Sequence, residues 1–150
     1  MHRRHPEIDR KSFIQGTVLA LGASLAVAAT AQTASAAKSK LVLQVSDADP
    51  AKWGLALNNA KNVQQELGAG KVDIEIVAYG PGIGMLKAEA PTANRVSEAT
   101  QAGIKVVACE NTMTTQGLTK ADMHAAIGYA PSGVVEIMSR QSEGWAYVRP

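Results

Sequence analysis

The predicted architecture follows from Lys40–Gly80, "KLVLQVSDADPAKWGLALNNAKNVQQELGAGKVDIEIVAYG". Residues 40–46 are nearly continuous in apolar and β-branched side chains, which is typical of a strand covered on both faces. Asp49 can cap a helix and Gly68 can end it. A second strand is expected at residues 71–79. A strand, a crossover helix and a strand of these lengths predict a parallel pair.

The predicted helix carries one apolar face. Pro50 suits its first position, because the backbone N–H there has no partner within the helix. The apolar positions follow the three-to-four spacing of a buried helix face. They are Trp53, Ala56, Leu57, Ala60, Val63 and Leu67. We therefore expect Trp53 to belong to the core rather than to stack on a ligand.

The rest of the chain continues the alternation of helices and strands. Helices are expected at 92–102, 120–127 and 133–144, strands at 104–109 and 145–150, and either a strand or a loop at 127–131. The predicted fold class is α/β, with three α/β/α layers around a roughly five-stranded, mainly parallel sheet. Residues 37–150 are long enough to form one such domain with its own core.

This topology predicts where a functional site lies. The loops that follow parallel strands gather at the carboxyl edge of the sheet, where ligands bind. Four segments should meet there, "SDADP", "YGPGIGML", "CENTM" and "YAPSG". The candidate catalytic residue is Cys109. The candidate binding residues are Asp47, Tyr79, Gly80, Gly82, Gly84, Glu110, Asn111, Thr112 and Met113.

Cys109 is the only cysteine of the chain and stands where a predicted strand ends. It can be a small buried hydrophobic residue, or one half of a disulfide between two chains in an oxidising compartment. It can also be a reactive thiolate, stabilised by the N–H groups of a following helix. Glu110 opposes this third interpretation, because a neighbouring negative charge raises a thiol pKa. The residues alone leave all three open.

The glycine-rich segment "GPGIG" at 80–84 follows a predicted strand, and its backbone N–H groups could approach an anion. However, Met85 occupies the place of the last glycine of a dinucleotide-binding turn, and no P-loop lysine follows. We expect a turn that walls the pocket, with nucleotide binding as the alternative. No metal or cofactor is expected, since Cys109 and His124 on unrelated elements do not make a ligand set.

Residues 1–36 resemble a secretory signal peptide. A basic start precedes an uncharged stretch at 16–30, and the small residues "ASA" at 34–36 suggest cleavage near Ala36–Ala37. The alternative is a membrane anchor, but an apolar stretch of about fifteen residues is shorter than the roughly twenty needed to span a bilayer. We therefore expect a periplasmic protein with no membrane attachment after cleavage.

The segment "RKSFI" at 10–14 is similar to the twin-arginine export signal. Lys11 stands in place of the second arginine, which leaves the general secretory route open. The leader contains four of the 15 basic residues and two of the 13 acidic residues, so eleven of each remain after cleavage. A formally neutral surface lacks the positive charge that nucleic-acid binding requires.

Four segments of the chain together resemble the DsrE/DsrF-like family, in a branch of small α/β proteins. They are "LVLQVSDADPAKWGLALNNAKNVQQELG", "VDIEIVAYGPGIGML", "GIKVVACENTM" and "GVVEIMSRQSEGWAYVRP", which span nearly all of 41–150. The resemblance implies a five-stranded parallel sheet and a homo-oligomer, either a trimer or a hexamer. It also implies that Cys109 corresponds to the cysteine that accepts sulfur as a persulfide in sulfur-relay relatives.

The leading functional hypothesis is an exported sulfur carrier, rather than a turnover enzyme, in which Cys109 handles sulfane sulfur. Its partners would be a sulfur donor or acceptor, either a protein or a small sulfur compound. The hypothesis requires an accessible sulfur atom on the same edge of the sheet as the glycine turn. The alternative is a non-catalytic ligand-binding or scaffold protein in which Cys109 only packs.

Overall fold

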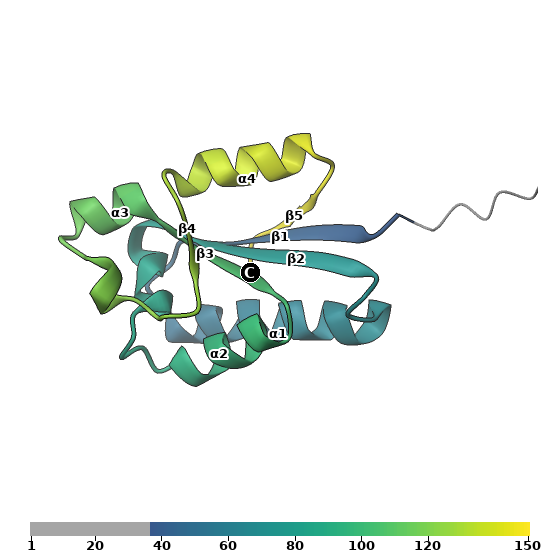
Figure 1. The fold of residues 1–150 in the computed structure, drawn as a ribbon, viewed down its shortest axis with the longest axis horizontal. Coiled ribbons are helices and arrows are strands. Elements are labelled where there is room, and N and C mark those ends of the chain that lie inside the picture. Colours follow the sequence, from purple (N-terminus) through teal and green to yellow (C-terminus); the bar gives the residue numbers. More distant parts are fainter. Residues whose placement is uncertain (1–36) are drawn as a thin grey trace, which may run out of the picture. The chain divides into compact units, whose positions relative to one another are not determined.

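A computed structural model describes residues 37–150, which form alternating strands and helices (Figure 1). In chain order the elements are β1 Ser39–Val45, α1 Pro50–Leu67, β2 Val72–Ala78, the 3-10 helix η1 Gly80–Leu86, α2 Ala93–Gln101, β3 Lys105–Cys109, α3 Glu110–Thr115, the 3-10 helix η2 Lys120–Asp122, β4 Gly128–Ala130, α4 Gly133–Ser142 and β5 Ala146–Val148. The predicted signal peptide, residues 1–36, lies outside the described residues.

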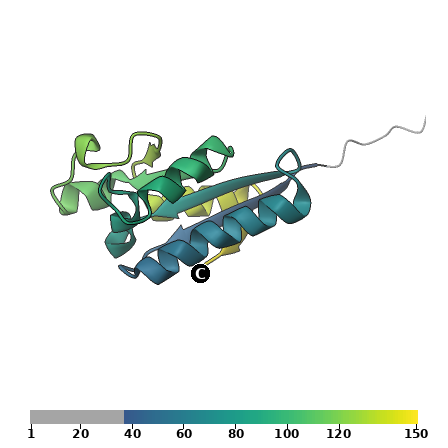
Figure 2. The ribbon, with the colours of Figure 1, turned by 90° about the horizontal axis from the view of Figure 1, so that it is seen from below.

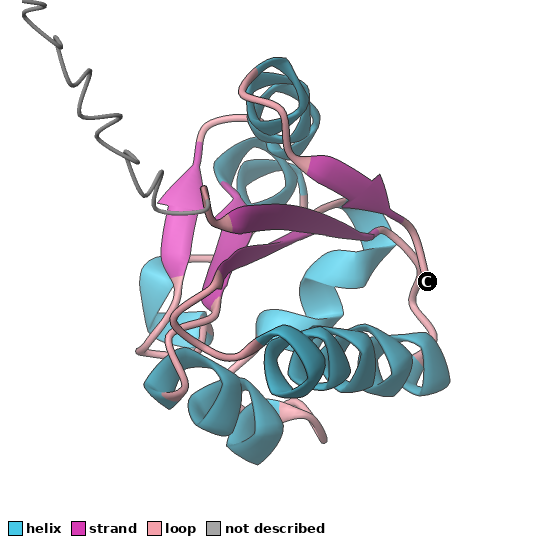
Figure 3. Ribbon diagram, turned by 90° about the vertical axis from the view of Figure 1, so that its right-hand side faces the viewer, coloured by secondary structure: helices cyan, strands magenta, loops and turns pink. Residues whose placement is uncertain are grey.

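The sheet has five strands in the order β4-β3-β2-β1-β5, and every neighbouring pair is parallel. Helices α1 and α2 cover one face and α4 covers the other (Figure 1 and Figure 3). This confirms the predicted three-layer α/β/α fold. Residues 127–131, which the sequence left open, contain the edge strand β4.

Helix α1 forms as its capping residues predict. The Asp49 carboxylate accepts a hydrogen bond of 2.8 Å from the Ala51 N–H, and Gly68 ends the helix with φ 91°. Trp53 is buried in the core, as expected. The predicted apolar face extends too far along the helix. Leu67, in its last turn, is 44% exposed and does not belong to the core. Figure 2 shows α1 lying along the sheet.

The two faces of the sheet bury cores of different sizes. The face under α1 and α2 carries most of the buried apolar side chains, including Leu43, Ile76 and Met85. The face under α4 has a small cluster of Val42, Val77, Val107, Ala130 and Ile137. Helix α4 itself buries only Gly133 and Ile137. Much less apolar contact therefore holds α4 than holds α1.

Two segments that were expected to be loops are helical. Residues 80–86 form η1, which is held by burial of Ile83, Met85 and Leu86 rather than by helix propensity. Residues 110–115 form α3, which begins directly where β3 ends. Both segments lie at the carboxyl edge of the sheet.

The predicted helix at 120–127 is wrong beyond its first turn. Thr119 and Asp122 form a capping box around η2, as the Thr119 signal suggested. The chain then leaves the helical path, because Met123 pairs with Lys87 in an isolated antiparallel bridge and the His124 N–H donates to the Leu86 carbonyl at 2.8 Å. These long-range pairings override the local helical pattern. No helix within residues 37–150 is long and apolar enough to cross a membrane.

Candidate functional site

Cys109 lies at the junction of a strand and a helix. It is the last residue of β3 and the N-cap residue of α3, with φ −78° and ψ 114°. The Sγ atom is 4.0 Å from the carbonyl oxygen of Pro131, too far for more than a weak hydrogen bond. The residue is only 5% exposed. The sulfur is therefore on the predicted edge, but it is not the open thiol that the carrier hypothesis requires.

The surroundings of Cys109 favour the thiolate. Burial raises the pKa of the thiol. The Thr112 hydroxyl and the backbone N–H groups of Gly133, Thr112 and Asn111 act in the opposite direction, and together they lower the pKa by more than burial raises it. The net effect is a pKa below that of an ordinary cysteine. Since the thiolate is the nucleophilic form of cysteine, this environment favours reactivity once a reagent reaches the sulfur.

Thr112 connects the thiol to the glycine turn. Its Oγ1 accepts a hydrogen bond of 2.9 Å from the Gly80 N–H, where Gly80 has φ 52°. A hydroxyl has one donor proton and two acceptor lone pairs. The Gly80 N–H therefore occupies one acceptor position of the hydroxyl, whose proton remains available for donation. The Thr112 hydroxyl also lowers the pKa of the Cys109 thiol, so the same side chain connects the glycine turn and the sulfur.

Gly133, at the start of α4, closes the other side of the site. A Cβ atom at Gly133 would lie 3.0 Å from the Tyr79 Cβ and 3.3 Å from the Cys109 Cβ, so a larger residue here would have to push Tyr79 or Cys109 aside by a few tenths of an ångström. Sequence reasoning placed "YAPSG" at this edge but did not single out Gly133. The signal was there, because Ser132 caps α4 and places the first N–H groups of that helix next to the sulfur.

Glu110 does not act on the sulfur as the sequence suggested. Its carboxylate pairs with Lys120 at 3.6 Å, and both side chains are largely exposed. The Lys120 ammonium also lies 4.6 Å from the centre of the Tyr129 ring. The negative charge of Glu110 is therefore engaged at the surface.

The remaining predicted residues have other surroundings. Asp47 pairs with Lys52 at 3.3 Å and with Arg149 at 3.4 Å, and hydrogen bonding to Lys52 holds the pKa of Asp47 below its usual range. Met113 is part of the main core. The structure thus brings Cys109, Thr112, Asn111, Gly80 and Tyr79 together, and it places Asp47, Glu110 and Met113 in other contacts.

Gly82 and Gly84 are packing positions. A Cβ atom at Gly82 would lie 2.2 Å from the Val45 carbonyl oxygen, and one at Gly84 would lie 3.0 Å from the Trp53 ring. Gly82 therefore allows η1 to rest on the end of β1. Gly80 and Pro81 instead line a shallow hollow of about 230 Å³ together with Asn111, Thr112, Thr115 and Gln116. This hollow adjoins Thr112, but Cys109 does not line it.

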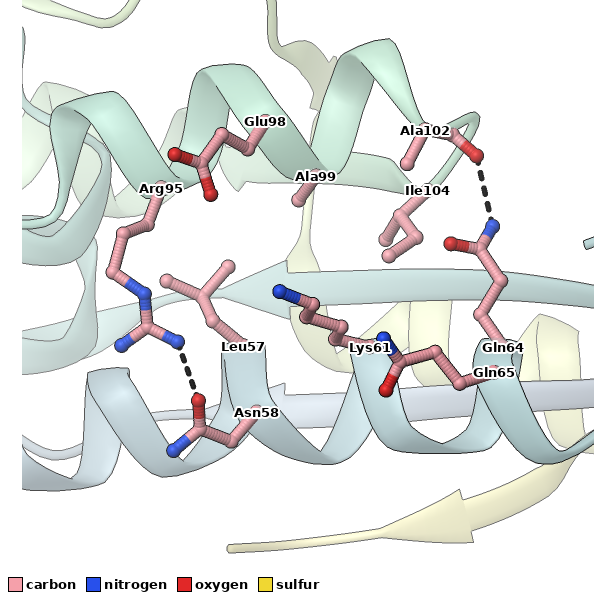
Figure 4. Close-up of a pocket in the computed structure, with 10 residues that line it drawn as sticks. All are labelled: Leu57, Asn58, Lys61, Gln64, Gln65, Arg95, Glu98, Ala99, Ala102 and Ile104. Atoms are coloured by element: carbon pink, nitrogen blue, oxygen red, sulfur yellow. Dashed lines mark hydrogen bonds between the residues drawn. The ribbon is translucent and has the colours of Figure 1, made fainter.

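A larger hollow of about 430 Å³ lies between α1 and α2 (Figure 4). Hydrogen bonds from Arg95 to Asn58 and from Gln64 to the Ala102 carbonyl bridge its two helices. None of the predicted site residues lines it. Among residues 37–150 there is no group of three or more histidine, cysteine or acidic side chains that could hold a metal ion.

The chemistry that this arrangement supports is that of a stabilised anion. The Thr112 hydroxyl and the backbone N–H groups of Gly133, Thr112 and Asn111 lower the pKa of the Cys109 thiol, which favours a thiolate or a persulfide anion. No second titratable side chain hydrogen-bonds to the sulfur in the part of the chain that the structure describes.

The sequence matches the model of the DsrE/DsrF-like family over residues 22–150. No protein of curated function matches it significantly. Two solved structures share the fold at low identity. The protein of unknown function BT1422 from Bacteroides thetaiotaomicron is 15% identical, with a TM-score of 0.61 over 74% of this chain and 94% of that chain. The ychN protein from E. coli is 11% identical, with a TM-score of 0.61 over 76% of this chain and 99% of that chain.

A third solved structure is similar in sequence as well as in fold. It is the protein of unknown function MTH1491 from Methanobacterium thermoautotrophicum, which is 34% identical with a TM-score of 0.72, over 75% of this chain and 100% of that chain. Together with the family match over most of the sequence, this similarity leads to one conclusion: the chain belongs to the DsrE/DsrF-like family.

Proposed function

We propose that this protein is a sulfur carrier in which Cys109 accepts one sulfur atom as a persulfide. What supports it best is the place of Cys109 at the end of β3, against Gly133 of α4, together with a thiol pKa that the Thr112 hydroxyl and nearby backbone N–H groups hold below that of an ordinary cysteine. These donors favour an anionic sulfur in a place where burial alone would favour the neutral thiol. A merely packed cysteine has no need of them.

The loading step is a nucleophilic displacement at sulfur. The Cys109 thiolate attacks the outer sulfur of thiosulfate, a new S–S bond forms to Cys109, and the S–S bond of thiosulfate breaks. Its electron pair leaves with sulfite. The products are the Cys109 persulfide anion and sulfite, so charge and atoms balance. The persulfide is a reversible modification.

Delivery reverses this chemistry. A thiolate of an acceptor attacks the outer sulfur of the persulfide, and the Cys109 thiolate leaves. The same donors that favour the thiolate make it a better leaving group, since a thiol of lower pKa leaves faster. The site thus supports transfer in both directions, which suits a carrier.

The test is intact-mass spectrometry of the purified protein after incubation with thiosulfate or polysulfide. We expect a mass increase of one sulfur atom, removed by a reducing agent and missing in Cys109→Ser. A Ser97→Ala variant, changed away from the sulfur at the His124 contact, serves as a control and should load like the wild type. Equal spectra for the wild type and Cys109→Ser would exclude the carrier function.

A second candidate is a non-catalytic scaffold in which Cys109 only packs. The observation that favours it is the 5% exposure of Cys109. This burial also disfavours a disulfide between two chains. The scaffold predicts a thiol that stays unreactive toward iodoacetamide at every pH at which the protein is folded, and a Cys109→Ala variant with unchanged behaviour.

Two further proposals concern the setting of the protein. We propose export to the periplasm, supported by the leader-like composition of residues 1–36. We also propose a homo-oligomer, either a trimer or a hexamer, supported by the exposed apolar residues Val134, Val135 and Met138 on α4. In the periplasm the partners would be donors and acceptors of sulfur other than those of the cytoplasm.

A further inference from the structure

The nearly closed position of Cys109 raises the question of what must move for a reagent to reach it. The segment on the sulfur is the start of α4, since Pro131 and Gly133 both contact Cys109. The strand β3 behind Cys109 is an interior strand of the sheet, paired with β2 on one side and β4 on the other. Access through β3 would break the sheet, whereas access through the start of α4 would not.

Residues 128–148, comprising β4, α4 and β5, form a strap across one face of the sheet. They join one edge of the sheet to the other, because β4 and β5 are the two edge strands. Each edge strand has only three residues, and each pairs with one neighbour. Figure 1 shows α4 alone on this face. Short edge strands and one helix with two buried residues hold this strap through fewer apolar contacts than hold α1.

The middle of the strap is held by charged contacts as well as by the apolar packing of Ile137. Arg140 of α4 donates from Nε to the Glu75 carboxylate of β2 at 2.8 Å, and Lys105 of β3 lies 3.3 Å from the same oxygen. Arg140 also pairs with Glu136 at 2.7 Å and with Glu143 at 3.1 Å. Arg140 thus ties the strap to β2 through a charged contact, and Glu136 of the strap also pairs with Lys105 of β3 at 3.7 Å.

Glu75 is an unusual residue for this place. It is completely buried, and its Oε1 atom has no hydrogen-bond partner within the described part of the chain. A buried carboxylate with one unsatisfied oxygen destabilises the closed state compared with an apolar side chain of similar size. The Glu75–Arg140 ion pair is therefore short and well aligned, but it adds little net stability to the closed state. This small net stability permits opening of the strap.

We propose that the strap 128–148 is a gate over Cys109 and that the Glu75–Arg140 ion pair is its latch. With the latch closed, Gly133 covers the sulfur and its N–H stabilises the thiolate. With the latch open, the start of α4 leaves the sulfur, and a donor or acceptor reaches it. This inference concerns regulation of the sulfur that the proposed function uses.

The first test uses the wild-type protein and the rate at which iodoacetamide alkylates Cys109. Opening of the strap exposes little surface, so the rate should rise only weakly with urea below the unfolding transition. If iodoacetamide could reach Cys109 only through global unfolding, the alkylation rate would rise with urea as steeply as the unfolding equilibrium constant does. That result would overturn the gate without any variant being made.

The second test removes the latch. In Glu75→Gln and in Arg140→Met we expect alkylation to become faster by on the order of tenfold, because one partner of a buried pair is lost. The matched control is Asp73→Asn. Asp73 lies on β2 two residues before Glu75, and this change removes its exposed ion pair with Lys38. Its alkylation rate should stay at the wild-type value. The double variant Glu75→Gln/Arg140→Met should show less than the product of the two single effects.

Amide hydrogen exchange decides where the opening occurs. In Glu75→Gln, exchange in α4 should accelerate while exchange in α1 and β2 stays unchanged. Uniform acceleration over all elements, or an alkylation rate equal to that of the wild type, would overturn the latch. Alkylation does not involve sulfur transfer, so the gate can fail while persulfide still forms, and persulfide formation can fail while the gate is confirmed.

Discussion

At the scale of single residues, the site depends on Thr112 and Gly133 as much as on Cys109. The cysteine alone is compatible with a packed hydrophobic residue. What distinguishes it is a lowered thiol pKa, to which the Thr112 hydroxyl contributes while its Oγ1 accepts a hydrogen bond from the Gly80 N–H. Cys109 and Thr112 could be identified from the sequence, since both follow a predicted strand. The contact with Gly133 could not, because it depends on the closing of β4 onto β3.

The pH dependence of alkylation tests Thr112. The rate of Cys109 alkylation should follow the thiolate fraction, with a midpoint below that of an ordinary cysteine. In Thr112→Val the hydrogen bond to the sulfur is lost, so the pKa and the midpoint should rise. Thr112→Ser retains the hydroxyl and should stay near the wild type. A midpoint that is the same in Thr112→Val and the wild type would show that Thr112 does not tune the thiol.

The free energy of unfolding should also depend on the ionisation of Cys109. Because the pKa of Cys109 is lower in the folded state, its thiolate stabilises the fold fully above the pKa of the unfolded chain, and this stabilisation is lost as the pH falls through the folded pKa. The difference in free energy of unfolding between the wild type and Cys109→Ser should therefore grow with rising pH in this window. Urea unfolding at a series of pH values measures it, and a constant difference would contradict the lowered pKa.

Gly82 tests the close packing of the glycine turn. A Cβ atom there would lie 2.2 Å from the carbonyl oxygen of Val45, and the backbone of β1 cannot yield. Gly82→Ala should lower the free energy of unfolding by about 2–4 kcal/mol. Gly70→Ala is the control, since a Cβ atom at Gly70 meets nothing within 4 Å, and it should change stability by less than about 0.5 kcal/mol. Equal effects in urea unfolding would mean that η1 is free to move away from β1.

At the scale of elements, prediction succeeded where local signals and tertiary packing agree. Helix α1 has its cap, its first-turn proline and its apolar face, and the structure confirms them. The helices η1 and α3 were missed because "GPGIGML" and "ENTMTT" have poor intrinsic helix propensity, and contacts with the ends of β1 and β3 hold them. The predicted helix at 120–127 failed for the converse reason, since bridging of Met123 to Lys87 outweighs its pattern.

The N-cap of α1 gives a prediction at this scale. Asp49→Ala leaves the Ala51 N–H without its partner, and we expect a loss of about 1 kcal/mol in the free energy of unfolding. Asp49→Ser keeps a side-chain acceptor and should stay close to the wild type. Urea unfolding of the three proteins measures both values. If Asp49→Ser lost as much as Asp49→Ala, the negative charge at the start of α1 rather than the cap hydrogen bond would be the cause.

At the scale of the whole molecule, the two faces of the sheet have different roles. The face under α1 and α2 carries the larger core and supports the fold. The face under α4 has few buried apolar residues, a buried ion pair and the sulfur. The sequence predicts both helix layers, but it does not predict this asymmetry. Glu75 and Val77 alternate on the same face of β2, so the pattern predicts that Glu75 is buried without indicating which charged residue pairs with it. Only the crossing of α4 brings Arg140 to that position.

The outer surface of α4 gives the last prediction. Val134, Val135 and Met138 are 49%, 58% and 60% exposed in the single chain, a pattern typical of an interaction surface. If copies of this chain cover α4, Met138→Glu should shift the wild-type oligomer toward monomer in sedimentation experiments. Asn62→Glu places the same charge on the exposed side of α1 and should leave the assembly unchanged. A monomeric wild type at all concentrations, or an intact oligomer in Met138→Glu, would exclude this surface. Because α4 also closes over Cys109, a neighbouring copy would hold the strap shut, so dissociation in Met138→Glu should accelerate alkylation of the thiol as well.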